Sequence, residues 1–69
     1  MTQTERVLYY MKRFGSITPV QALMDLGVMR LGARIWDLKH DGYKIKAEMM
    51  TGKNRLGQET HFSKYSLEE

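Results

Sequence analysis

The 69-residue chain contains no cysteine and only two histidines, His40 and His61. Without thiols it can form neither a disulfide framework nor a thiolate zinc site, and two imidazoles argue against a metal-stabilised fold. No run approaches the roughly 20 apolar residues that span a bilayer, and no signal-peptide pattern opens the chain. We therefore expect a cytoplasmic protein without membrane, metal or cofactor partners, stabilised by its hydrophobic core alone.

Features that could support catalysis are also scarce. Residues 1–69 allow one domain at most, and a chain of this size buries only about 60% of the surface that its unfolded form exposes. It has too little mass to enclose a pocket. Ser63 and Ser66 lie in no strained or glycine-framed turn, and Asp37 and His40 fit a surface cluster on a helix. We expect no enzyme and no catalytic residue.

The positive charge is unevenly placed along the chain. Residues 29–58 hold seven Lys and Arg against three Asp and Glu, a net of +4, so the remainder sums to −1 in a chain of net charge +3. Such an excess is typical of a surface that faces a polyanion. The alternative is that these Lys and Arg residues only make the exposed faces of the protein hydrophilic.

Two helices with capping signals are predicted over residues 3–14 and 19–26. Thr2 and Thr18 each stand three residues before a Glu or Gln, the spacing of a capping box, and a glycine follows each helix. Ile17, between the helices, must be buried and can add a short strand to a sheet. The inward-facing residues are expected to be Val7, Leu8, Met11 and Phe14 with Tyr10 beside them, then Leu23, Leu26 and either Val20 or Ala22.

A third helix is predicted over residues 29–41, ending before a glycine. At 100° per residue, Leu31, Ile35 and Leu38 fall within one narrow arc, which is the pattern of a buried stripe. Trp36 lies off this stripe. We expect it to pack against the first helix or the sheet rather than contact a base, because aromatic residues at helical spacing usually belong to the core.

The hydrophobic period changes from 3.6 to 2 after the third helix, which predicts a two-stranded ribbon. Its strands are expected over residues 43–51 and 59–67. Phe62 is out of phase with Tyr65 and Leu67, so a bulge or twist is expected between them. The first strand should be half-buried through alternate residues, namely Tyr43, Ile45, Ala47 and Met49.

Helix, glycine turn, helix and ribbon is the order of a winged helix-turn-helix. The sequence therefore predicts an α+β fold of three helices with a C-terminal two- to three-stranded β-wing. A helix fits the major groove of B-DNA, and Arg30 or Arg34 could bond bidentately to a guanine, a contact worth about 1–3 kcal/mol of discrimination. Basic side chains at the wing tip, residues 52–58, suit the minor groove or the flanking phosphate backbone. The predicted DNA contacts are Thr18, Met29, Arg30, Gly32, Ala33, Arg34 and Asp37, with Lys53, Asn54 and Arg55 on the wing.

Two of these residues have alternative interpretations. Glycine within a helix costs about 1 kcal/mol relative to alanine, so Gly32 should allow a close approach, either of the DNA backbone or of the second helix. Arg34 can instead form an ion pair with Asp37 or Asp41 on its own helix.

The sequence resembles the small helix-turn-helix domain of phage and prophage proteins, itself a winged helix. This resemblance implies a tri-helical core with a β-wing and DNA binding, and it implies no reaction and no particular target. Gly32 departs from the family pattern, in which alanine or serine is expected. The residues that carry the resemblance are Gly15-Ser16-Ile17-Thr18-Pro19, Arg30-Leu31, Ala33-Arg34-Ile35, Asp37-Leu38, Gly42-Tyr43 with Ile45, and Thr51-Gly52-Lys53-Asn54-Arg55.

We therefore expect a protein that binds double-stranded DNA, either a transcription regulator of phage or mobile-element type or an excisionase-like architectural factor. The alternative is a protein–protein interaction module, such as a phage-encoded inhibitor of a host defence complex. That alternative is favoured by the weak net charge, by Asp37 on the presumed reading face, and by Met29, Met50 and Trp36 as exposed candidates. A monomer presents a small interface, so tight DNA binding favours a homodimer or a larger phage or host protein as partner.

Overall fold

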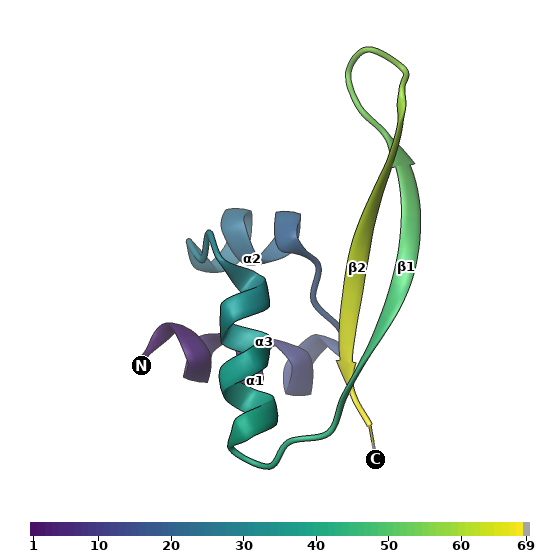
Figure 1. Ribbon diagram of the computed structural model, residues 1–69. Helices are drawn as coiled ribbons and strands as arrows, with labels where there is room; N and C mark the ends of the chain where they lie inside the picture. The colour runs from purple at the N-terminus through teal and green to yellow at the C-terminus, as the bar shows by residue number, and fades with distance from the viewer. Residues whose placement is uncertain (69) are drawn as a thin grey trace.

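The computed structural model describes residues 1–68 and places three helices before a two-stranded antiparallel sheet. The helices gather at one end, and the ribbon rises well beyond them (Figure 1). The molecule is accordingly elongated, 38 × 23 × 20 Å. This is the predicted winged helix-turn-helix architecture. The elements are α1 Gln3–Phe14, α2 Pro19–Leu26, α3 Leu31–His40, β1 Ile45–Lys53 and β2 Glu59–Leu67.

Both predicted capping boxes are present. The Thr2 hydroxyl accepts a hydrogen bond from the Glu5 amide at 3.1 Å, and the Thr2 amide donates to Glu5 Oε1 at 3.0 Å. Thr18 and Gln21 repeat the arrangement at 3.3 and 3.0 Å. Each box satisfies backbone amides that have no partner within the helix, so the starts of α1 and α2 are determined locally.

The helix α3 is shorter than the predicted range of 29–41. Arg30 is its N-cap, with a non-helical φ of −118° and ψ of 67°. The cause lies in the preceding turn, where the Val28 amide donates to the carbonyl of Ala22 at 2.9 Å and the Val28 side chain is 1% exposed. Burial of Val28 holds the chain outside the helical conformation until Leu31.

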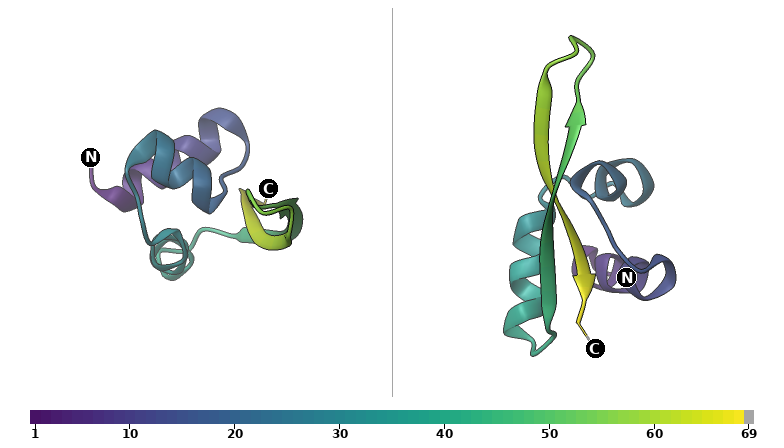
Figure 2. Two further views of the ribbon diagram at one scale, coloured as in Figure 1. Left: turned by 90° about the horizontal axis from the view of Figure 1, so that it is seen from above. Right: turned by 90° about the vertical axis from the view of Figure 1, so that its right-hand side faces the viewer.

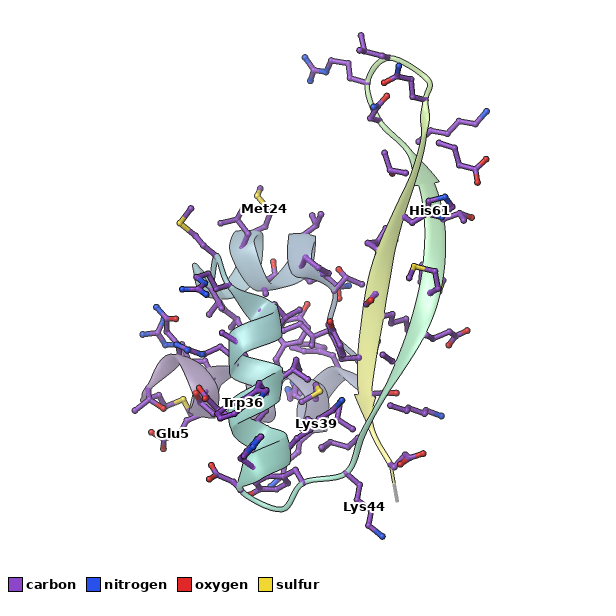
Figure 3. All side chains as sticks on the ribbon, in the orientation of Figure 1. Glu5, Met24, Trp36, Lys39, Lys44 and His61 are labelled. Atoms are coloured by element: carbon purple, nitrogen blue, oxygen red, sulfur yellow. The ribbon has the colours of Figure 1, made fainter. Side chains whose placement is uncertain are left out.

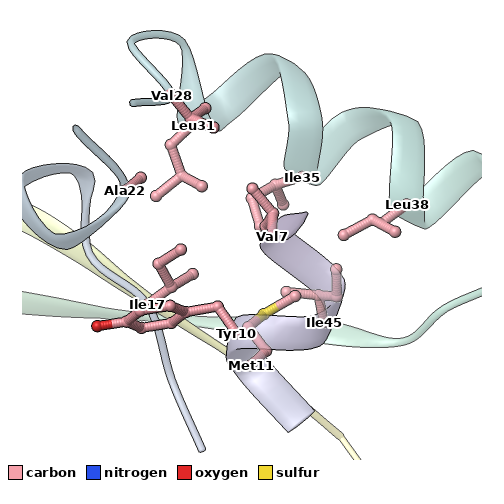
Figure 4. Packing of buried hydrophobic residues seen from close by; sticks show 10 residues of the cluster. All are labelled: Val7, Tyr10, Met11, Ile17, Ala22, Val28, Leu31, Ile35, Leu38 and Ile45. Carbon is pink, nitrogen blue, oxygen red and sulfur yellow. The ribbon is translucent and has the colours of Figure 1, made fainter. Parts of the chain in front are cut away.

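The core lies between the three helices and the base of the ribbon (Figure 4). Two of the predicted core residues are wrong, because Phe14 is 65% exposed and Leu23 is 49% exposed. Tyr10 is buried as predicted, and of the two alternatives Val20 and Ala22 it is Ala22 that is buried. The Tyr10 hydroxyl donates to Asp25 and thereby connects α1 to α2. The buried residues are Val7, Tyr10, Met11, Ile17, Ala22, Val28, Leu31, Ile35, Leu38 and Ile45.

The prediction that Trp36 packs in the core is wrong. Its side chain is 59% exposed, whereas the predicted stripe of Leu31, Ile35 and Leu38 is buried. The indole ring stacks on the His40 ring, with the centroids 3.6 Å apart. At 100° per residue Trp36 points well away from that stripe, and the first helix covers the stripe rather than the flank that carries the indole.

The ribbon pairs continuously from Ile45–Leu67 to Lys53–Glu59. No bulge interrupts it, and of the two expected features, a bulge or a twist, the strands show the twist (Figure 2). The strand β1 begins at Ile45 rather than at residue 43. Within β1 only Ile45 is buried, whereas Ala47 and Met49 are exposed, since β2 rather than β1 packs against α1 and α2.

A single β-bridge at Ile17, where the sequence predicts a short strand, joins the base of the ribbon. The Ile17 amide donates to the Tyr65 carbonyl at 2.8 Å, and the Tyr65 amide donates back at 2.9 Å. Ile17 itself is fully buried. This pairing joins the turn between α1 and α2 to β2 and fixes the direction in which the ribbon leaves the helices.

Candidate nucleic-acid interface

The N-terminal turn of α3 is exposed and carries positive charge. Met29 is 84% exposed, and the neighbouring Arg30 and Gly32 are exposed as well. Within residues 1–68, no side chain caps this helix, in contrast to α1 and α2. Free amides at a helix N-terminus attract anions because the helix dipole and the N–H groups point at the same position.

The surroundings of Gly32 separate its two interpretations. A Cβ atom placed on Gly32 would meet no heavy atom within 4 Å among the described residues. Close packing against α2 is therefore not the reason for this glycine. The backbone at Gly32 is exposed on the outer side of α3, so a partner molecule can approach it closely.

Arg34 and Asp37 contact the start of α1. The Arg34 Nη1 atom donates to Gln3 Oε1 at 3.4 Å, and the Thr4 hydroxyl donates to Asp37 Oδ2 at 3.2 Å. Arg34 Nε lies 3.2 Å from Asp37 Oδ2, but its N–H does not point at that oxygen, so the two form an ion pair without a hydrogen bond. Both side chains are thus engaged between α1 and α3, and Asp41, the other candidate partner of Arg34, is not used.

Part of the outer face of α3 is formed by residues that are not among the predicted contacts. Trp36, Lys39 and His40 are exposed on this helix, and His40 Nδ1 lies 3.1 Å from the carbonyl of Trp36. The helical periodicity could have found them, since all three lie away from the Leu31 and Leu38 stripe. Of the predicted contacts on α3, only Gly32 and the half-buried Ala33 share this outer face without being engaged by α1.

A shallow hollow with acidic groups adjoins this outer face. It lies between the first turn of α1 and the last turns of α3, and Trp36, Asp41 and Glu5 contribute to its lining. Trp36 and Glu5 lie on the same side of the helices (Figure 3). The hydrogen bond from the Thr2 amide holds the pKa of Glu5 below its ordinary value, so this carboxylate stays charged at neutral pH. The potential here is unfavourable for phosphate.

The wing tip is a turn that hydrogen bonds of Asn54 hold in place. Asn54 Oδ1 accepts hydrogen bonds from the amides of Leu56 and Gln58, at 2.9 and 3.0 Å. Asn54 Nδ2 donates to Gln58 Oε1 at 3.1 Å, and the Asn54 backbone pairs with Gln58 and Gly57 at 3.0 Å each. Asn54 therefore has an intramolecular role, with both polar atoms of its side chain occupied.

The remaining predicted contacts lie at the two ends of the interface. Lys53 and Arg55 are exposed on either side of Asn54. Thr18 is half-buried at the start of α2, and both its hydroxyl and its amide are used in the capping box. The structure thus leaves Arg30, Lys53 and Arg55 as exposed cations among the predicted contacts.

A family model described as a winged helix-turn-helix domain matches residues 2–69. No curated protein and no solved structure matches the chain. In the part of the chain that the structure describes, no helix is long and apolar enough to cross a membrane, and no group of His, Asp and Glu side chains could hold a metal ion.

Proposed function

Because the chain belongs to the winged helix-turn-helix domain family, whose members are in general DNA-binding and typically not enzymes, we propose that it binds double-stranded DNA through α3 and the wing. The N-terminal turn of α3 would lie in the major groove, and the wing tip would contact the flanking backbone. The observation that carries this proposal is the exposed, cationic start of α3, where no described residue lies within 4 Å of a Cβ at position 32 and so none requires glycine there. A helix backbone can approach DNA most closely where no side chain intervenes.

The placement of charge supports the same orientation. Arg30 at the start of α3 and Lys53 and Arg55 on the wing are exposed, whereas the acidic hollow lies at the opposite end of α3. The resemblance to phage and prophage domains supports a finer assignment, a cytoplasmic transcription regulator or excisionase-like architectural factor of a phage or mobile element. A homodimer or a larger protein partner would enlarge the small interface that one copy offers.

Selection of duplexes from a random pool tests the proposal, followed by fluorescence anisotropy of the selected duplex over a range of salt concentrations. Neutralising about five phosphates predicts a slope near −4.5 in a plot of log affinity against log salt. A palindromic selected site would also establish a dimer. Failure to recover any duplex, even at low salt, would refute the proposal.

Matched arginine variants locate the interface. We expect Arg30→Ala to weaken binding about 10- to 100-fold and to relax the selected sequence, because a bidentate contact to guanine is lost. Arg55→Ala should reduce the salt slope by about one unit with little change in sequence preference. Arg13→Ala is the control, since it removes one exposed arginine from α1, outside the proposed interface. Equal effects of all three would indicate nonspecific attraction only.

One observation favours a second function, recognition of a protein. The 59% exposed Trp36, stacked on His40 beside an acidic hollow, presents an aromatic group of the kind that anchors protein interfaces. The partner could be the target of a phage-encoded inhibitor. If Trp36→Ala abolishes capture of a protein while Arg30→Ala and Arg55→Ala do not, the protein-binding function holds.

A further inference from the structure

An apolar side chain stands alone at the far end of the wing. Leu56 is 81% exposed, and it is the only hydrophobic residue between positions 51 and 61. Single exposed leucines are common and need no explanation by themselves. Leu56 differs from such residues because it lies at the tip of the ribbon and because hydrogen bonds hold the turn around it.

The turn around Leu56 holds it in place. The Leu56 amide donates to Asn54 Oδ1 at 2.9 Å, and the same oxygen accepts from the Gln58 amide on the other side of the tip. The Asn54 side-chain amide also bonds to Gln58. These bonds fix the backbone on both sides of Leu56, so little backbone entropy remains to be lost when the tip enters a binding site.

The wing is long enough to carry Leu56 away from the helices. The nine residues of β1 rise about 3.4 Å each, so Lys53 lies roughly 27 Å along the strand from Ile45. One turn of B-DNA is about 34 Å, so a minor groove lies roughly half that distance from the centre of an adjacent major groove. A wing whose base packs against α1 and α2 is therefore long enough to span the backbone between these two grooves.

The chemistry of the tip fits the minor groove. Lys53 and Arg55 flank Leu56 in sequence, and residues 51–58 include no acid. The minor groove is about 6 Å wide, too narrow for a ribbon but accessible to side chains at its tip. Cationic side chains in that groove combined with one apolar wedge are the combination by which architectural proteins unstack a base step.

We propose that Leu56 inserts between base pairs in the minor groove next to the site of α3 and kinks the duplex there. This inference rests on the proposed DNA-binding function and adds a deformation of the DNA to it. Lys53 and Arg55 bind the phosphates of the two DNA strands, and the hydrogen bonds of Asn54 hold the turn that carries Leu56. Partial unstacking of one base step then bends the duplex by about 20–90°. The bend brings more of the flanking backbone to the wing.

The experiment uses the duplex selected by the wild-type protein, with a donor and an acceptor dye at its two ends. Energy transfer measures the bend, and 2-aminopurine placed at successive steps reports unstacking by its fluorescence. We expect the wild-type protein to raise both signals. Leu56→Ala should lose most of the rise in both and bind about tenfold more weakly, because the buried leucine surface is lost.

Two further variants make the result specific. Leu56→Met retains a long apolar side chain and should restore the bend. Met49→Ala removes a 66% exposed apolar side chain from the ribbon away from the tip, and should bend DNA as the wild type does. If the wild-type protein binds the duplex without bending it, or if Leu56→Ala bends it equally, the wedge is refuted while DNA binding stands. If no duplex is bound at all, both proposals fail.

Discussion

The two ends of the ribbon differ sharply in what they contact. At the base, Ile45 is 8% exposed, and Tyr65 bridges to the buried Ile17, while β2 packs against α1 and α2. Beyond the helices, in the segment of residues 49–63 that we call the distal wing, no side chain is buried. The same hairpin therefore belongs to the core at one end and projects into solvent at the other.

The distal wing is held together by local contacts in place of a core. Phe62 pairs with Met50, and both side chains are half-buried. A Cβ on Gly52 would lie 3.4 Å from Phe62 Cε1, so the ring covers the glycine diagonally across the strands. The phase of Phe62, which suggested a bulge, instead places its ring on the face opposite Tyr65. The comparison indicates that folding stability resides at the base, whereas the tip is free to serve binding.

Removal of a core side chain tests the first half of this comparison and should have the largest effect. Leu38 on α3 is 2% exposed, and truncation of a buried leucine to alanine costs about 2–5 kcal/mol. A domain of this size has only a few kcal/mol of stability. We expect Leu38→Ala to lose most of its helical circular dichroism at 25 °C or to unfold at much lower urea.

The adjacent Lys39→Ala is the matched control, because Lys39 is exposed on the same helix. Its urea midpoint should stay close to that of the wild type, since alanine and lysine have similar helix propensities. Comparable losses in the two variants would mean that α3 is stabilised by its exposed face as much as by its buried stripe.

Truncation of Phe62 tests the second half of this comparison, the claim that local contacts hold the distal wing together. We expect Phe62→Ala to lower the global free energy of unfolding by less than about 1 kcal/mol, the range of cross-strand pairs. Amide exchange should accelerate in residues 49–63 while amides at the base of the ribbon, including Tyr65, keep their protection. The control is His61→Ala, which removes an exposed neighbour on the other face of the strand. Global unfolding of Phe62→Ala would show that the wing and the helices fold as one unit.

The sequence predicted those parts of the fold that depend on local signals. The capping boxes at Thr2 and Thr18 need only a spacing of three residues, and the buried stripe of α3 needs only the helical period. The start of α3 could not be predicted in this way, because burial of Val28 is a tertiary effect. The exposure of Phe14 has the same origin, since whether another element covers the end of α1 depends on tertiary packing and not on the helical period.

The candidate site was predictable by region rather than by side chain. The basic segment and the element order pointed to the start of α3 and to the wing tip. The engagement of Arg34 by Gln3 depends on how α1 crosses α3, which no local pattern encodes. The role of Asn54 is different, because an asparagine at the start of a short polar turn often bonds to backbone amides two residues on, and this signal was present in the sequence.

The hydrogen bond between Tyr10 and Asp25 supplies the smallest predicted effect, a polar contact at the edge of the core. This bond raises the pKa of Tyr10 above its ordinary value of 10.0. The folded protein therefore holds the phenolic proton more tightly than the unfolded chain does, so the bond contributes its full stability below about pH 10. That contribution is lost as the pH rises through the raised pKa of the folded state.

We therefore expect Tyr10→Phe to unfold at slightly lower urea than the wild type at pH 7, with the difference shrinking above about pH 10 as the wild-type phenol ionises. Tyr9→Phe is the control, because Tyr9 is 56% exposed on the same helix and its hydroxyl makes no hydrogen bond within the described residues. A difference that stays constant from neutral to alkaline pH would mean that the Tyr10 ring, and not its proton, carries the effect. In that case α1 would be oriented against α2 by packing alone.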